Sequence, residues 1–169
     1  MANIVFIGGI HGSGKGTICK NICAQKGCIH LTASELLQWK DISDKSNKFV
    51  DNIVDTQKRL LLGLSKTIEK DKFYLLDGHF CLFNKKGEIS KIPETTFMQI
   101  SPKLIGVVKE NVQLIKERLE SRDKKHYDLN VLKQMQDKEI AYSKEIAKKL
   151  GVKHFEINSN SYYNLLENM

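Results

Sequence analysis

The sequence predicts a single α/β domain of three layers, in which a central parallel sheet of about five strands carries helices on both faces. Apolar runs of strand length alternate with segments of helical spacing along the whole chain. A glycine-rich segment directly follows the first apolar run, and Asp77 ends a later run. The length of 169 residues fits one domain with a sizeable core. Ligands of such a domain bind at the carboxyl ends of its strands.

The first expected strand, 3–7, leads into the glycine-rich segment 9–17 and then into a helix-like segment. Glycines allow successive backbone N–H groups to turn inward, and a helix N-terminus adds partial positive charge. Lys15 can then reach the β- and γ-phosphates of a nucleotide as a point charge. A strand, glycine-rich loop and helix in this order form a P-loop. The residues expected to bind ATP here are Gly12, Ser13, Gly14, Lys15, Gly16 and Thr17.

The position after the lysine departs from the usual P-loop pattern. A serine or threonine commonly follows the lysine, whereas here Gly16 intervenes and the hydroxyl comes one residue later, on Thr17. Asp77, at the end of an apolar run, is of the type that orders Mg²⁺ at the phosphates. Thr17 and Asp77 are therefore the candidate metal ligands, and we expect Mg²⁺ to be held mostly through water. An aspartate before a glycine can also simply begin a turn.

The lysine-glycine-threonine ending of the loop resembles the nucleoside monophosphate kinases of the adenylate kinase type, although His11 stands where those enzymes usually have proline. The segment 77–79 looks like the archaeal and nuclear branches of these kinases. The resemblance implies transfer of the γ-phosphoryl group of Mg-ATP to a nucleoside monophosphate, with AMP the first expectation. The arginines that hold the acceptor phosphate in common adenylate kinases are replaced by Gln38 and Cys81, with Lys40 a possible substitute.

The segment after the first helix is expected to form a short buried strand at 28–31 and a helix that Thr32 or Ser34 caps. Apolar residues then recur near helical spacing from 53 to 70. The resemblance implies a monophosphate-binding segment at about 32–70. The candidates for contact with the acceptor are Thr32, Lys58, Arg59 and His79. The charged pair on the helix can equally face solvent, and the histidine can equally be structural.

Further along the chain, strands are expected at 73–77, 103–108 and 152–157, and helices at 111–119 and 131–150. A turn is expected at 84–88, and the residues from there to Pro93 show no strong periodicity. The final residues, 161–169, are expected to form a short helix.

Arg118 and Arg122 lie four residues apart on one side of a helix end, in a chain with only three arginines. Their position resembles the entrance of the LID segment of adenylate kinases. This implies a short LID at about 121–131, with Arg118 on the donor adenine and Arg122 on its phosphates. Asn158 would lie near the donor base, and Lys15, Asp77 and Arg122 would be the catalytic residues. Exposed ion pairs with neighbouring glutamates are the alternative for the two arginines.

The composition bears on where in the cell the protein is expected to act. No apolar run approaches the roughly 20 residues of a membrane span, and the first apolar run is too short for a signal peptide. The cysteines show no C-x-x-C pair and no disulfide-dense spacing, which predicts a reducing cytoplasm. Cys19, Cys23, Cys28 and His30 lie close in sequence and could form a metal site. The favoured interpretation is that the cysteines are small buried residues.

The net charge of +7 permits nucleic acid as a partner but does not favour it, because the lysines are scattered. Two other functions stay open. One is a kinase for a different small acceptor, which the missing acceptor arginines support. The other is an ATPase switch that acts with RNA or protein. The sequence leaves the oligomeric state open.

Overall fold

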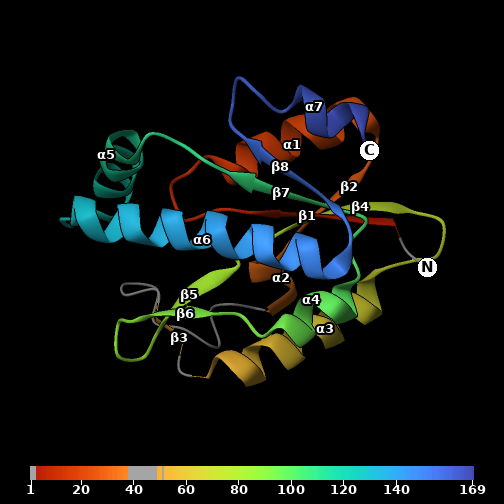
Figure 1. The fold of residues 1–169 in the computed structure, drawn as a ribbon, viewed down its shortest axis with the longest axis horizontal. Coiled ribbons are helices and arrows are strands. Elements are labelled where there is room, and N and C mark those ends of the chain that lie inside the picture. Colours follow the sequence, from red (N-terminus) through yellow and green to blue (C-terminus); the bar gives the residue numbers. More distant parts are fainter. Residues whose placement is uncertain (1–2, 38–48, 51) are drawn as a thin grey trace.

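The computed structural model describes residues 3–37, 49–50 and 52–169. Its centre is a five-stranded parallel sheet in the order β2-β4-β1-β7-β8 (Figure 1), which confirms the predicted fold class. The strands are β1 (Asn3–Gly8), β2 (Ile29–Thr32), β4 (Phe73–Asp77), β7 (Leu104–Val108) and β8 (Lys153–Ile157). Because β1 lies between β4 and β7, its carboxyl end opens at the middle of one sheet edge.

Helices cover both faces of this sheet (Figure 1). They are α1 (Lys15–Lys26), α2 (Ala33–Leu37), α3 (Ile53–Thr67), α4 (Glu94–Ile100), α5 (Val112–Asp123), α6 (Leu129–Leu150) and α7 (Tyr163–Glu167). Alternate residues of β1 enter different cores: Ile4 and Phe6 pack with α3, α4 and α6, whereas Val5 and Ile7 pack with α1 and α7. A strand buried on both faces needs apolar residues throughout, which explains the continuous apolar runs of the sequence. No helix within the described ranges has the length and apolarity to cross a membrane.

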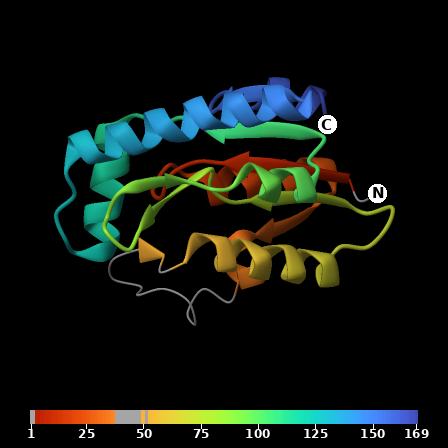
Figure 2. The ribbon, with the colours of Figure 1, turned by 60° about the horizontal axis from the view of Figure 1, so that its bottom comes forward.

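A smaller sheet lies beside the α3–α4 side of the molecule (Figure 2). It consists of β3 (Phe49–Val50), β5 (Cys81–Asn84) and β6 (Ile89–Lys91), and β5 and β6 form an antiparallel hairpin. Asn84 Oδ1 closes the turn by accepting hydrogen bonds from the N–H groups of Lys86 and Glu88 at 2.9 and 3.0 Å. The turn was predicted, but these strands and α4 were not, because strands of two to four residues carry too little periodicity.

The strand predicted at 28–31 is present as β2, but it is not buried as expected. β2 is the edge of the main sheet, and 40% of the Ile29 surface is exposed. The cysteine spacing did not predict a disulfide. Cys23 and Cys28 nevertheless form one, with Cα atoms 4.6 Å apart. Gly27, in the left-handed conformation, ends α1 and turns the chain back so that the two cysteines meet.

The helix predicted at 53–70 is present as α3, and Asn52 caps it by accepting the N–H of Asp55 at 3.1 Å. Its buried face carries Gln57, Leu60 and Leu64, whereas Val54 is exposed. α3 packs on α2 and α4 and so forms one wall of the region beyond the ends of β1 and β4.

Candidate functional site

The glycine-rich loop joins the end of β1 to the start of α1. Gly12 and Gly14 have φ angles of 79° and 85°, in the left-handed region that favours glycine. A β-carbon on Gly12 would lie 2.9 Å from Leu119 Cγ, so α5 packs directly against the loop. Gly14 precedes α1 and provides no side-chain cap, which leaves the first amides of the helix to an external acceptor. These features together make a site for an anion such as phosphate.

Ser13 lies inside this loop and its side chain is buried. Its Oγ has no hydrogen-bond partner among the residues that the structure describes. A buried hydroxyl without a partner is costly, so a ligand oxygen at this place would satisfy it. Lys15, Gly16 and Thr17 form the first turn of α1, and the Thr17 side chain is exposed there.

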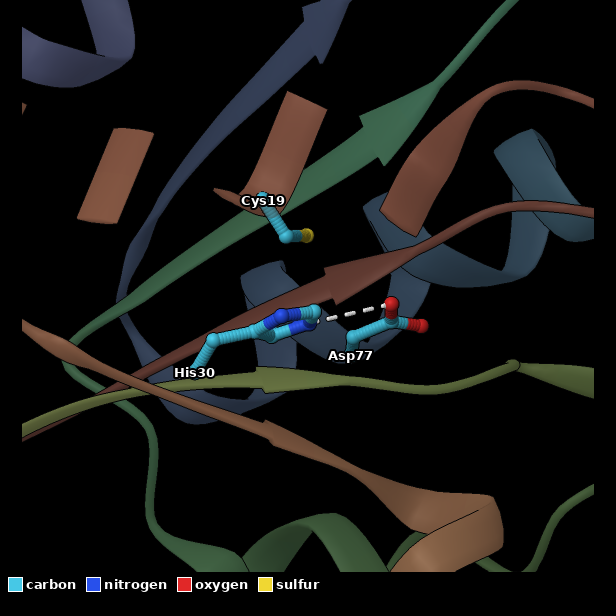
Figure 3. A group of neighbouring side chains, drawn as sticks. All are labelled: Cys19, His30 and Asp77. Carbon is cyan, nitrogen blue, oxygen red and sulfur yellow. Dashed lines mark hydrogen bonds and ion pairs between the residues drawn. The ribbon is translucent and has the colours of Figure 1, made fainter. Parts of the chain in front are cut away.

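Asp77, at the end of β4, links the loop to the edge strand. Its Oδ1 lies 2.5 Å from Lys15 Nζ, and its Oδ2 lies 3.2 Å from His30 Nε2 (Figure 3). Burial by itself would raise the pKa of Asp77, but the hydrogen bond with His30 and the charge of Lys15 outweigh it and hold the pKa below its ordinary value. The carboxylate is therefore ionised at neutral pH and compensates the lysine charge.

Cys19 on α1 approaches the same carboxylate from above the sheet, so that Cys19, His30 and Asp77 converge (Figure 3). A sulfur, a ring nitrogen and a carboxylate oxygen lie within 4.8 Å of one another there. Burial raises the pKa of the Cys19 thiol, which is therefore protonated, and both Asp77 oxygens already have partners. In the structure this trio is a buried polar contact, and any cation that binds Asp77, Mg²⁺ included, would have to displace Lys15 or His30 from one of its oxygens.

The donor atoms around the loop fit Mg²⁺, which prefers oxygen ligands and retains several waters. Asp77 offers carboxylate oxygens, and Thr17 offers a hydroxyl one helical position beyond Gly16. A β-carbon on Gly16 would lie 3.8 Å from Asp77 Oδ2. A serine there would place its hydroxyl beside the carboxylate, whereas glycine leaves that room to water. The geometry thus fits a metal bound largely through water.

Glu139 on α6 holds the two segments of the site together, and sequence reasoning missed it. Its Oε1 accepts the N–H groups of Gly9 at 3.0 Å and Phe80 at 2.8 Å, and its Oε2 accepts that of Cys81 at 2.7 Å. Burial raises the pKa of Glu139 to about 7, although the three N–H groups oppose the shift. The available signal was its helical spacing from Leu132 and Met135, which places a carboxylate on the buried face of α6.

The two arginines of α5 lie in the second half of that helix and have different partners. Arg118 Nη1 donates to the carbonyl of Gly12 at 3.2 Å, so this guanidinium touches the glycine-rich loop. Arg122 forms two hydrogen bonds with Asp123, at 2.7 and 2.8 Å. Asn158, beyond the end of β8, pairs with Ser161 at the same edge of the sheet as the loop.

A cavity of about 290 Å³ lies between the loop, the β5–β6 hairpin and the start of α6. Arg122, His126 and Tyr127 from the predicted LID line it, together with His11 from the loop. Residues 124–128 are the whole connection between α5 and α6, so the predicted LID of 121–131 includes the two helix ends as well.

A second cavity, of about 370 Å³, is lined by Lys15 and shares His11 with the first. Lys15, Asp77 and His79 form its polar end, and His79 lies against His11 with ring centroids 4.5 Å apart. Its apolar lining comes from Phe6, Leu37, Leu60, Leu82, Phe97 and Ile100, and further polar groups come from Thr32, Ser34, Gln57 and Thr96. This is the place where an acceptor molecule with an apolar body could meet the loop.

The predicted acceptor residues lie in two different places. Thr32 and His79 line the larger cavity, and Thr32 Oγ1 also accepts the N–H of Glu35 at 3.1 Å, which caps α2. Lys58 and Arg59 lie on the exposed face of α3, away from the lining residues. Gln57, which sequence reasoning did not single out, lines the cavity instead. Gln38 and Lys40 lie outside the described residues.

Comparison with known proteins places this site within a family. A family model described as an AAA domain (AAA_17) matches residues 8–135. Among curated proteins, UMP-CMP kinase 3 from Oryza sativa subsp. japonica is 29% identical over 137 residues. The alignment covers 76% of this chain but only 62% of that protein, which is less than two thirds of the relative's length.

Solved structures share the fold at low sequence identity. A shikimate kinase from Acinetobacter baumannii in complex with shikimate has a TM-score of 0.58 and 13% identity, with 99% of this chain and 90% of that chain covered. A gluconokinase from Sinorhizobium meliloti 1021 has a TM-score of 0.52 and 11% identity, with 98% and 94% covered. Since the family model spans the loop, Asp77 and both arginines of α5, the chain belongs to the AAA_17 family of AAA domains.

Proposed function

We propose that this protein is an ATP-dependent phosphotransferase that transfers the γ-phosphoryl group of Mg-ATP to a nucleoside monophosphate. The observation that carries the proposal is the position of Lys15. It stands at the start of α1, in the anion site of the loop, and also lines the larger cavity. A triphosphate held by the loop would therefore end at the polar end of a cavity suited to an acceptor, and such positioning is most of what phosphoryl transfer needs.

The donor would be held by the loop amides, by Ser13 and by Lys15. Arg118, already in contact with the loop, would cover the adenine, and Asn158 would lie near it. Arg122 would exchange its partner Asp123 for the transferring group when residues 121–131 close as a LID. Asp77 and Thr17 would hold Mg²⁺ through water, and the ion when bound neutralises charge on the phosphates.

The larger cavity supports a base-bearing acceptor. Its apolar side chains would contact a planar ring well. The curated relative bears the name of a UMP and CMP kinase, and the sequence resembles adenylate kinases of the archaeal and nuclear type. AMP is therefore the first acceptor to test, and CMP and UMP are the next. Segment 32–70 would supply the acceptor contacts, with Thr32 and His79 in the cavity and Lys58 and Arg59 reaching it only by rearrangement.

The test is ATP consumption and product formation with a panel of monophosphates, with purified protein and Mg²⁺. We expect diphosphate products from at least one monophosphate, and loss of turnover in Lys15→Ala in a protein that is still folded by circular dichroism. Phosphorylation of a sugar acid or another non-nucleotide acceptor, but of no monophosphate, would contradict the acceptor class. Hydrolysis of ATP that RNA or a protein stimulates, without any acceptor product, would favour a switch instead.

A further inference from the structure

The disulfide between Cys23 and Cys28 joins two elements that meet again at Asp77. Cys23 lies near the end of α1, the helix that begins at Lys15. Cys28 directly precedes β2, the strand that carries His30. Lys15 and His30 each bind one oxygen of Asp77, at 2.5 and 3.2 Å. The disulfide therefore closes a ring of contacts that begins and ends at this carboxylate.

β2 is held to the rest of the protein by little besides this tie. It has four residues, lies at the edge of the main sheet and, among the described strands, pairs with β4 alone. Its residues are exposed or half-buried, and short strands with little buried apolar surface open locally at low cost. The disulfide limits this opening, because it fixes the start of β2 to α1, whose inner face packs in the core.

The effect of the disulfide is expected to be local. Cys23 and Cys28 are five positions apart, so the bond closes a small ring, and a small ring stabilises the whole fold less than a large one. Two cores with residues from all parts of the chain support the fold independently of it. The bond therefore acts on the junction of α1 and β2 rather than on folding as a whole.

The four cysteines differ in their access to solvent. Cys19 and Cys81 are fully buried, and burial raises the pKa of both thiols, so they are protonated and unreactive. Cys23 is 9% exposed, whereas Cys28 is only partly buried and can meet an external thiolate. In the reducing cytoplasm that the cysteine spacing predicts, disulfides are usually transient.

We infer that Cys23 and Cys28 form a reversible thiol–disulfide switch, which holds β2 and the His30 contact on Asp77 when oxidised and releases them when reduced. The reductant is a dithiol. Its thiolate attacks the Cys28 sulfur, the S–S bond breaks, and Cys23 leaves as a thiolate that takes up a proton. The second thiol of the reductant then breaks the mixed disulfide, which releases the Cys28 thiol and leaves the reductant as a disulfide. A low-molecular-weight disulfide drives the reverse reaction.

The switch acts on nucleotide binding through Asp77. His30 and Lys15 share the negative charge of this carboxylate. When His30 withdraws, the carboxylate binds Lys15 more strongly, so a phosphate competes for the lysine less well. The loss of one such hydrogen bond corresponds to about three- to tenfold weaker binding of ATP. This effect rests on the proposed function, whereas the hold on β2 does not.

The first measurement is amide hydrogen exchange of the whole protein, in buffers that contain a small thiol and its disulfide at different ratios. Alkylation of free thiols gives the oxidised fraction in each buffer. We expect a folded protein in both states, with the amides of β2 exchanging about tenfold faster after reduction and those of β1 unchanged. Equal exchange of β2 in the two states, or loss of the fold on reduction, would overturn the inference.

Cys28→Ser and Cys81→Ala separate this disulfide from the other thiols. Cys28→Ser cannot form the bond, so its β2 amides should exchange at the reduced rate in every buffer. Cys81→Ala removes a free thiol and keeps the disulfide, so β2 should respond to the thiol ratio as in the unmodified protein. Protection of β2 in Cys28→Ser, or a lost response in Cys81→Ala, would contradict the assignment.

The second measurement is calorimetric titration with ATP in the presence of a metal chelator. We expect the reduced protein to bind ATP about three- to tenfold more weakly than the oxidised protein. Equal affinities would overturn the link between the switch and the nucleotide site. Binding of ATP in neither state would overturn the proposed function and this link together, while the exchange of β2 decides the disulfide switch by itself.

Discussion

Lys15 Nζ lies 2.5 Å from Asp77 Oδ1, so the cation that faces the loop is compensated by the carboxylate at the end of β4. His30 holds the other oxygen of the same carboxylate. A nucleotide phosphate would have to compete with Asp77 for Lys15, and Mg²⁺ would relieve that competition by taking up the carboxylate charge. On the proposed function, the pair would couple the binding of nucleotide to the binding of metal.

This coupling predicts the behaviour of Asp77→Asn. The neutral amide no longer competes for Lys15, so we expect ATP to bind about tenfold more tightly when Mg²⁺ is chelated. Turnover with Mg²⁺ should fall about 100-fold because the metal loses its anchor. Calorimetry and a coupled assay measure the two effects. Asp137→Asn, which alters an exposed ion pair with Lys133, is the matched control. Unchanged ATP affinity in Asp77→Asn would show that the ion pair does not oppose nucleotide binding.

Gly16→Ser should lower the Mg²⁺ concentration that gives half-maximal activity. The β-carbon has room 3.8 Å from Asp77 Oδ2, and the new hydroxyl could ligate the metal directly in place of a water. We expect a shift of about three- to tenfold, because one direct ligand replaces a water. Thr17→Val should shift the requirement in the opposite direction. Thr95→Val, on an exposed position of α4, serves as the control. No shift in either variant would place the metal away from this turn.

Glu139 predicts a specific dependence of stability on pH. Its pKa is raised from 4.5 to about 7 in the folded protein. The folded state therefore holds this proton more tightly than the unfolded state, so stability is greatest below about pH 4.5 and falls as pH rises to about 7. The fall should be about 3 kcal/mol at most. Glu139→Gln removes the ionisation, so the free energy of unfolding of the unmodified protein minus that of the variant should decline over this range. A pH-independent difference in denaturant unfolding would refute the shift.

Arg118→Lys should raise KM for ATP about tenfold with a smaller effect on the acceptor. The guanidinium reaches both the carbonyl of Gly12 and Glu110, and a lysine cannot keep this fork or stack as well on a ring. Steady-state kinetics in both substrates measure the effect. Lys148→Arg, at an exposed position near the end of α6, tests for a general effect of exchanging one cation for the other. Equal KM values for ATP in Arg118→Lys and the unmodified enzyme would remove Arg118 from the donor site.

The main sheet and the loop follow from the sequence because their signals are local. A strand buried on both faces needs an unbroken apolar run, and a phosphate loop needs glycines at fixed positions next to a lysine. The run that contains Ile4 and the run that ends at Asp77 are therefore recognisable in the sequence as buried strands. The burial of the strand that contains Ile29 was predicted wrongly, because a short apolar run is also compatible with an edge strand. The order of strands in the sheet is not a local property of the sequence.

The candidate site also contains residues that local sequence signals predict and residues that depend on distant contacts. The positions of Lys15 and Asp77 depend on two neighbouring strands, so motif spacing was enough to bring them together. The roles of Gln57 and Glu139 depend on which face of α3 and α6 meets the sheet, and on the register between elements far apart in sequence. A polar residue at a buried helical position was the available signal. The resemblance to adenylate kinases pointed to Lys58 and Arg59 instead, although the helical spacing of Leu60 and Leu64 placed Gln57 on the inner face.

The fixing of three distant amides by one carboxylate has a further consequence for how the protein opens. Glu139 bonds Gly9, Phe80 and Cys81, and Tyr142 one turn later donates to the carbonyl of Ile92 at 2.7 Å. α6 is therefore hydrogen-bonded both to the glycine-rich loop and to the segment that forms the β5–β6 hairpin. Deuterium should enter these three amides at a common rate set by the lifting of α6, so that the glycine-rich loop and the hairpin open together rather than separately.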